Sequence, residues 1–150
     1  MEAKVTFDVT RSISPKGTKE IAQKLAQSLK GGEILALFGD LGAGKTVFVK
    51  GLAKGLKVDK PVTSPTFVFM KMYTAHASGK VITFYHLDLY RTDNNLDLQS
   101  LGIDEIFDKN SIVAIEWAEK LGKFLPKERI NITIKLADEK TRNITIDRRV

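Results

Sequence analysis

Eight residues in the first third of the chain have the types and spacing needed to hold a chain of phosphates. The segment from Gly39 to Thr46 reads GDLGAGKT and fits the P-loop pattern G-x-x-x-x-G-K-[ST]. A loop that surrounds a β-phosphate must point successive backbone N–H groups inward, and glycines tolerate the dihedral angles and close approach that this requires. Lys45 would supply positive charge to the β- and γ-phosphates, and the Thr46 hydroxyl is a hard oxygen ligand for Mg²⁺. The segment predicts a nucleoside triphosphate site, but it does not indicate which nucleotide or which reaction. The residues that we assign to nucleotide binding are Gly39, Asp40, Gly42, Ala43, Gly44, Lys45, Thr46 and Val47.

Two elements must position this loop, a strand before it and a helix after it. Residues 33–38 (EILALF) form a short, continuous apolar run that is typical of a buried strand. The residues after Thr46 (VFVKGLAKGL) predict a helix that begins at about Lys45 and closes on Gly55, so its N-terminal amides and dipole would face the anion. This order of strand, glycine loop and helix is the context that a P-loop requires. It makes a mere glycine-rich turn with an exposed lysine the weaker interpretation.

Hydrolysis or transfer of a phosphate also needs a carboxylate near Mg²⁺ and a group that orients the nucleophile. Ligands of open α/β sheets bind beyond the carboxyl ends of the strands, so acids that end apolar strands are the candidates. Glu116 directly follows the apolar run SIVAI, as in a Walker B element, and Asp88 lies in HLDLYR. With Lys45, these two acids are the candidate catalytic residues. Chain order alone leaves open which acid contacts the metal.

The segment around Asp88 has a polar face. His86, Asp88 and Tyr90 share one side of a strand by its period of two, opposite two leucines. This pattern suggests a polar site, with a solvent-facing edge strand as the alternative; an exposed strand-end glutamate is the corresponding alternative for Glu116. We consider His86 either an orienting partner of Asp88 or a structural histidine. Trp117 either stacks on a ligand or anchors the core.

The rest of the pattern indicates one mixed α/β domain over residues 1–150. Residues 4–9 alternate as an opening strand, and residues 18–29 predict an amphipathic helix with Thr18 as its N-cap. Residues 67–73 and 81–90 predict a hairpin, residues 96–107 a short helical stretch broken at Gly102, and residues 130–146 a closing hairpin. We therefore expect a P-loop NTPase-like three-layer domain with a mixed central sheet and β-hairpins.

Composition narrows the class of protein. A hydrophobic content of 43% with 28% charged residues is that of a soluble globular domain, and the chain has no cysteine, which excludes disulfides and cysteine catalysis. We expect a cytoplasmic protein, because no signal-like or membrane-spanning run is present. The net charge of +6 fits an RNA or acidic-protein surface, or simply a solvated lysine-rich surface. We favour the solvated surface, because no RNA-binding motif accompanies the charge.

Together with several further segments, these residues resemble a known family. The segments GDLGAGKT, SPTF (residues 64–67), HLDLYR (86–91), LGIDEIFD (101–108), IEWAEK (115–120) and FLP (124–126) occur in the order and spacing of the TsaE (YjeE) family. These are small bacterial P-loop ATPases that support threonylcarbamoyladenosine formation beside the anticodon of certain tRNAs. The resemblance covers about residues 10 to 136. Only the P-loop is specific by itself, whereas the ordered set is highly specific.

The resemblance implies an ATP/ADP site in which Thr46 and Glu116 coordinate Mg²⁺ and Asp88 is required for hydrolysis. It implies that the loop Ser64-Pro65-Thr66 responds to nucleotide state and that the partners are the TsaB and TsaD proteins; whether tRNA is contacted directly or only through these partners is left open. ATP hydrolysis by the isolated chain would be slow. Residues 10–14 are our candidates for the border of the adenine pocket.

Two positions depart from the family pattern. Family members commonly carry Thr or Ser where this chain has Val47, so a side-chain bond to the α-phosphate is in doubt while the backbone N–H remains available. Ala118 stands where proline is usual, which affects loop stiffness.

The sequence is also compatible with two other functions. One is a nucleotide-gated binding module with negligible turnover. The other is a small-molecule kinase, which we disfavour because the late arginines (Arg129, Arg142, Arg148 and Arg149) lie in or after a β-hairpin and not in a helical lid.

Overall fold

The computed structural model of the chain describes residues 5–63, 69–92 and 102–149. The elements follow in the order β1 (Val5–Ser12), α1 (Pro15–Ala26), β2 (Ile34–Phe38), α2 (Lys45–Gly55), β3 (Met70–Ala77), β4 (Lys80–Asp88), η1 (Ile103–Ile106), β5 (Ser111–Glu116), η2 (Ala118–Phe124), β6 (Arg129–Leu136) and β7 (Arg142–Arg149). Here η1 and η2 are 3₁₀ segments.

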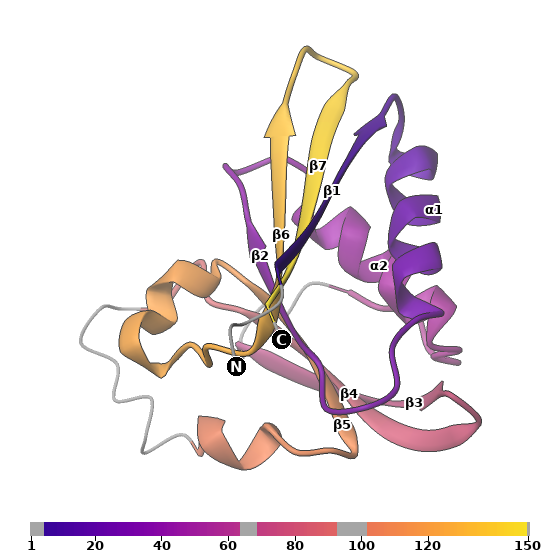
Figure 1. Cartoon of the computed structure of the whole chain (residues 1–150), viewed down its shortest axis with the longest axis vertical. Helices are drawn as coiled ribbons and strands as arrows, with labels where there is room; N and C mark the ends of the chain where they lie inside the picture. Colours follow the sequence, from indigo (N-terminus) through magenta and orange to yellow (C-terminus); the bar gives the residue numbers. More distant parts are fainter. Residues whose placement is uncertain (1–4, 64–68, 93–101, 150) are drawn as a thin grey trace.

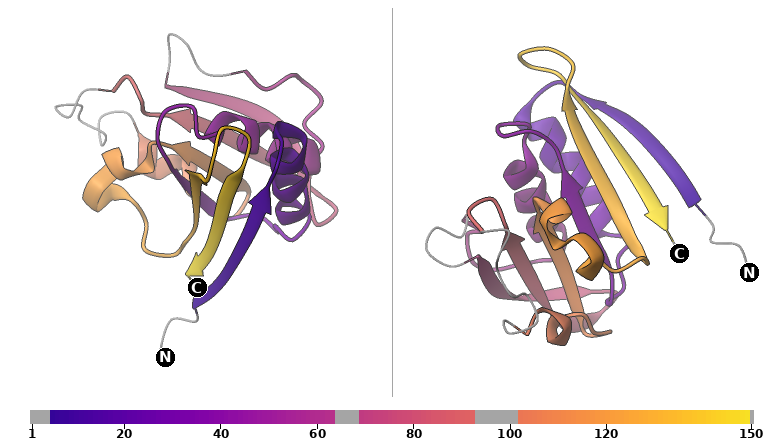
Figure 2. Two further views of the ribbon diagram at one scale, coloured as in Figure 1. Left: turned by 90° about the horizontal axis from the view of Figure 1, so that it is seen from above. Right: turned by 90° about the vertical axis from the view of Figure 1, so that its left-hand side faces the viewer.

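All described strands belong to one mixed sheet of seven strands, in the order β1-β7-β6-β2-β5-β4-β3. The four central strands β6, β2, β5 and β4 run parallel, whereas β7, β1 and β3 are antiparallel to their neighbours. The parallel strands β2, β5 and β4 therefore end side by side at one edge of the sheet. Figure 2 shows the strong twist of this sheet, since the strands at its two ends point in different directions.

Two apolar cores cover the two faces of the sheet. On one face α1 and α2 lie side by side over the strands, and on the other face lie η1, η2 and the loops around them (Figure 1). The second core is smaller and includes Ala118 and Leu121 of η2 against Ile115 of β5. The predicted α/β class, with a mixed sheet between two outer layers, is confirmed. Within the described residues, no helix is long and apolar enough to cross a membrane.

Small residues bring α2 close to α1. A Cβ atom added to Gly51 would lie 2.5 Å from the backbone oxygen of Lys19, and one added to Gly55 would lie 2.6 Å from the Cβ of Ala26. Because these distances are shorter than real contacts, the two glycines of α2 permit the helix approach that fixes the P-loop helix on the sheet.

Several local predictions need correction. Helix α1 begins one turn earlier than expected: Ser14 is its N-cap, with its hydroxyl accepting from the amide of Gly17 at 3.0 Å, and Pro15 is the first helical residue. Thr18 is instead a buried residue inside the helix. The predicted helical stretch 96–107 is a 3₁₀ segment over Ile103–Ile106, and its first part, residues 96–101, lies outside the described residues.

The two predicted hairpins are present. β3 pairs with β4 around a turn at residues 78–79, and β6 pairs with β7 around residues 137–141. However, β4 lies between β5 and β3, so the alternative of an edge strand around Asp88 is wrong.

Candidate nucleotide-binding site

The P-loop connects the end of β2 to the start of α2. Its three glycines all have positive φ angles, of 152° at Gly39, 81° at Gly42 and 111° at Gly44. At Gly39 the reason is also steric, because an added Cβ would lie 2.6 Å from the backbone oxygen of Ile134 on β6. The sequence pattern of the loop and its folded geometry therefore agree.

The start of α2 is open to an anion. The N-cap is Gly44, which provides no side-chain cap. Among the described residues, the backbone amides of Gly42, Gly44, Lys45 and Thr46 donate to no other group. Unpaired amides at a helix N-terminus are suitable donors to phosphate oxygens, so the loop fits the group that the sequence predicts.

Lys45 is buried, with 5% of its surface exposed. Its Nζ donates to the carbonyl oxygens of Gly39 and Asp40 and lies 4.2 Å from the ring centroid of Trp117. Burial lowers the pKa of Lys45, and the nearby carboxylates, Glu116 foremost, oppose that shift. The ammonium group is therefore held inside the loop by two backbone carbonyl groups.

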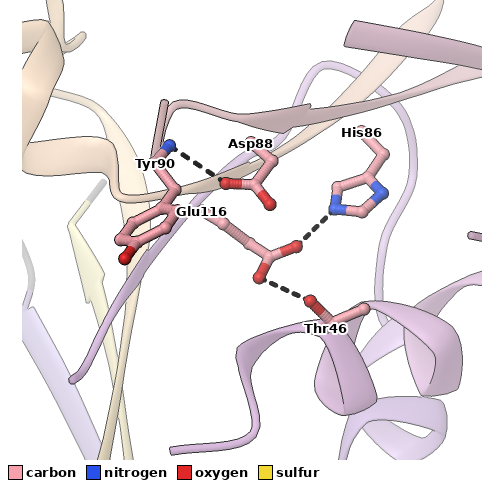
Figure 3. A network of polar contacts seen from close by, with 5 residues as sticks. All are labelled: Thr46, His86, Asp88, Tyr90 and Glu116. Carbon is pink, nitrogen blue, oxygen red and sulfur yellow. Dashed lines mark hydrogen bonds and ion pairs between the residues drawn. The ribbon is translucent and has the colours of Figure 1, made fainter. Parts of the chain in front are cut away.

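The carboxylate of Glu116 lies directly beside the P-loop. The Thr46 hydroxyl donates to Oε1 of Glu116 at 2.8 Å, and Nε2 of His86 lies 2.5 Å from Oε2 (Figure 3). Glu116 ends β5, as predicted, and only 3% of its surface is exposed, so the alternative of an exposed strand-end glutamate is wrong. The two predicted magnesium ligands, Thr46 and Glu116, are thus in contact although 70 positions separate them.

Asp88 ends the neighbouring strand β4, where it is in register with Glu116. Its Oδ1 accepts from the backbone N–H of Tyr90 at 3.1 Å. Partial burial raises the pKa of Asp88, the negative charge of Glu116 acts in the same direction, and the Tyr90 hydrogen bond opposes the shift. Figure 3 shows both carboxylates on the same side of the sheet edge. The structure therefore brings together Lys45, Thr46, Asp88 and Glu116, as expected from their positions at loop and strand ends.

His86 is fully buried and contacts Glu116 on β5. This partner differs from Asp88, which the first of the two sequence interpretations predicts, and the alternative of a structural histidine names no partner. Sequence spacing could place His86 and Asp88 on one face, but it could not show that Glu116 of the neighbouring parallel strand, in register with Asp88, lies within reach of the His86 ring. Trp117 follows Glu116 with a positive φ of 58°, and its ring packs on Tyr90 at 5.1 Å between centroids.

A cavity of about 430 Å³ opens beside the P-loop. It is lined by Ile13, Ser14, Pro15, Thr18, Gly42, Ala43, Gly44, Val47, Glu139, Lys140 and Arg142. Ile13 and Ser14 fall within the range 10–14 that we expected near the base, whereas Thr10 to Ser12 do not line the cavity.

Arg142 is a site residue that the sequence did not reveal. Its Nε donates to the carbonyl oxygen of Ala43 in the P-loop at 2.9 Å. The two residues are 99 positions apart, and β7 reaches the loop only because β6 lies beside β2 in the sheet. No local pattern could have indicated this contact.

The oxygen groups at the loop suit Mg²⁺, which is bound in proteins by one or two carboxylates together with substrate phosphates and water. Within the described residues, no group of three or more His, Cys, Asp or Glu side chains could hold a metal ion by itself. The Thr46 hydroxyl and the Glu116 carboxylate therefore fit an ion that is shared with a nucleotide. The predicted switch loop Ser64-Pro65-Thr66 lies outside the described residues.

Comparisons with known proteins point to one family. A family model described as "Threonylcarbamoyl adenosine biosynthesis protein TsaE" matches residues 12–144. A Bacillus subtilis protein named tRNA threonylcarbamoyladenosine biosynthesis protein TsaE is 42% identical over 135 residues, which cover 90% of this chain and 82% of the relative. An Aquifex aeolicus protein of the same name is 40% identical over 138 residues, which cover 91% of this chain and 92% of the relative.

A solved structure agrees with these matches. The crystal structure of Bacillus subtilis YdiB superposes with a TM-score of 0.77 at 37% identity, covering 97% of this chain and 87% of that chain. Both sequence and fold are therefore similar over nearly the whole length.

Proposed function

Because the chain belongs to the TsaE family, we propose that it binds and slowly hydrolyses Mg-ATP in support of threonylcarbamoyladenosine formation on tRNA. The observation that carries the proposal is the hydrogen bond from the P-loop hydroxyl of Thr46 to the strand-end carboxylate of Glu116. This contact joins a phosphate-binding loop to the acid that a nucleotide-bound Mg²⁺ requires. We propose that residues 1–150 act as a single ATPase domain.

The phosphates would occupy the space in front of the P-loop amides. Lys45 would leave the carbonyl oxygens of Gly39 and Asp40 and pair with the β- and γ-phosphates, since a phosphate oxygen carries more negative charge than a carbonyl. The backbone N–H groups of Gly44 and Thr46 would donate to the same anion, and the backbone N–H of Val47 would face the α-phosphate.

Thr46 and Glu116 would hold Mg²⁺ through the Thr46 hydroxyl oxygen and the Glu116 carboxylate, and the bound ion would supply positive charge to the phosphate oxygens. Asp88 remains as the second carboxylate of the site and would orient the attacking water. Burial and the charge of Glu116 raise the pKa of Asp88, and so make it a stronger proton acceptor than an exposed aspartate.

The nucleoside would lie in the cavity beside the P-loop. Ile13 and Pro15 offer apolar surface in its lining, which also includes Arg142 and Glu139. A cavity of about 430 Å³ lies within the usual size range of small-ligand sites. This placement would make the segment before α1 and the turn after β6 respond to whether the nucleotide is bound.

The resemblance also suggests the partners. We propose that the chain acts in the cytoplasm with the TsaB and TsaD proteins and that ATP hydrolysis resets their complex. The Ser64-Pro65-Thr66 loop would respond to the nucleotide state in that cycle.

One assay distinguishes the proposal from its alternatives. Purified protein is incubated with Mg-ATP alone, with tRNA, and with the TsaB and TsaD proteins, and the released phosphate is measured. We expect slow release by the chain alone and faster release with the complex. Tight ATP binding without turnover under every condition would favour a gated binding module, and phosphate on an added metabolite would indicate a kinase.

Variants test the assigned residues. Lys45→Ala should abolish nucleotide binding, because the charge that offsets the phosphates is lost. Glu116→Ala or Asp88→Ala should spare ADP binding and reduce hydrolysis, by about 10²–10⁴-fold for Asp88 if it handles the proton. Glu128→Ala, an exposed acid before β6, is the matched control and should keep the wild-type rate. Unchanged turnover in either site variant would contradict that assignment.

A further inference from the structure

We propose that His86 is a positioning residue that holds Oε2 of Glu116, so that Glu116 presents only Oε1 to the metal beside Thr46. This inference rests on the proposed function, because it concerns the carboxylate that would hold Mg²⁺. It assigns a role to a buried group that the hydrolytic mechanism itself does not use.

The two oxygens of Glu116 have different partners from different elements. Oε1 accepts from Thr46 at the start of α2, and Oε2 lies 2.5 Å from Nε2 of His86 on β4 (Figure 3). Because the ring occupies one lone-pair site of Oε2, it restricts rotation of the carboxylate and favours Oε1 as the oxygen that faces Thr46. When Thr46 turns toward a metal, the imidazole would keep Glu116 in place.

The surroundings of His86 define its tautomer. The ring is fully buried, and its Nδ1 has no hydrogen-bond partner among the described residues. A hydrogen on Nδ1 would be a buried donor without an acceptor, whereas a bare Nδ1 leaves only a weak acceptor unpaired. The hydrogen that bridges the ring and the carboxylate therefore lies on Nε2, which donates to Oε2 of Glu116.

Packing alone does not explain a histidine at this position. Ile82 and Phe84 precede it on the same face of β4 and are buried apolar residues of the core under α2. A leucine would continue that pattern but would leave Oε2 of a buried carboxylate without a donor. Hydrogen-bond partners of metal ligands commonly tune metal affinity in this way.

Two substitutions separate positioning from packing. Glutamine can place a side-chain N–H where Nε2 of the ring lies, whereas leucine fills the space without a donor. With ADP present, we expect His86→Leu to weaken Mn²⁺ binding, measured by electron paramagnetic resonance, on the order of 10–100-fold. His86→Gln should remain within a few-fold of the wild type, and ADP binding in EDTA should be unchanged in both variants.

Equal Mn²⁺ affinity in His86→Leu and the wild type would overturn the proposal, as would equal losses in the two variants. Should His86→Leu fail to fold, nitrogen NMR of the wild-type chain decides, because the chain has only two histidines. The proposal requires a ring that carries a hydrogen on Nε2, and a ring protonated at Nδ1 alone would contradict it. Absence of Mn²⁺ binding by the wild type with ADP would instead contradict the proposed function, while the NMR result would still test the contact.

Discussion

Glu116 and Asp88 show how two acids in one site acquire different properties. Glu116 is buried, yet each of its oxygens has a partner, Thr46 for one and His86 for the other. Asp88 is only partly buried, and within the described part of the chain its carboxylate accepts one backbone hydrogen bond, from Tyr90. Satisfied and buried, Glu116 is suited to hold a cation in one geometry. Asp88, with a raised pKa and fewer partners, is suited to contact water.

The raised pKa of Asp88 predicts a stability effect that depends on pH. Since the folded state holds the Asp88 proton more tightly than the unfolded state does, ionised Asp88 destabilises the fold at neutral pH, and this cost disappears as pH falls through the folded pKa. Asp88→Asn should therefore have a higher melting temperature than the wild type at pH 7 in EDTA. The difference should shrink towards acid pH. A gap that widens on acidification would contradict the assigned direction of the shift.

The helix pair α1 and α2 determines where the P-loop lies. α2 carries Lys45 and Thr46 at its N-terminus, and Gly51 and Gly55 on its side meet the backbone of α1 at close range. A glycine inside a helix ordinarily costs about 1 kcal/mol relative to alanine. Here the close approach of the two helices offsets that cost, because the contact between α1 and the glycines of α2, called the α1–α2 seam below, fixes α2 on the sheet.

This seam makes a prediction about a substitution that would stabilise an isolated helix. Gly51→Ala should reduce the free energy of unfolding by about 1–3 kcal/mol, because the added methyl group meets the backbone oxygen of Lys19, which cannot move like a side chain. Lys50→Ala changes an exposed residue on the same helix and should stay within about 0.5 kcal/mol of the wild type. Chemical denaturation of both variants checks this. Equal stability of Gly51→Ala and Lys50→Ala would show that the seam can expand.

The molecule as a whole joins distant segments around one loop. The sheet order places β6 beside β2, and so the β6–β7 hairpin extends past the P-loop. Arg142 on β7 donates to Ala43, while Ile13 and Ser14 before α1 border the same cavity. A nucleotide in this position would contact three parts of the chain that no single motif contains.

Arg142 offers a test of that arrangement. Arg142→Ala should weaken ADP binding about tenfold, because a hydrogen bond from a charged group contributes roughly 1.5–3 kcal/mol and part of that loss would be compensated by water. Arg148→Ala is the matched control, since Arg148 lies on the same strand but bonds to Ser28. Isothermal titration with ADP measures both variants. Equal ADP affinities of the two variants would contradict the assignment of Arg142 to the nucleotide site.

Much of the site could be predicted from the chain, because its chemistry lies in short segments. The glycines, Lys45 and Thr46 are adjacent in sequence, and acids at the ends of apolar strands must meet at one edge of a parallel sheet. Glu116 and Asp88 could be found on this basis. Two local predictions are wrong. Both Ser14 and Thr18 can cap a helix, and α1 begins at the earlier residue because Pro15 follows Ser14. Residues 103–106 form a 3₁₀ segment, whereas the sequence pattern predicts a helical stretch.

The sequence by itself determined the residue types of the site, the class of fold and, through ordered motifs, the family. Only the tertiary structure decided the partners: His86 with Glu116, Arg142 with Ala43, and α1 against the glycines of α2. The physical reason is that hydrophobic periodicity and turn residues report local conformation. Contacts between residues 30 to 99 positions apart depend on the order and register of the strands, which emerge only when the sheet assembles.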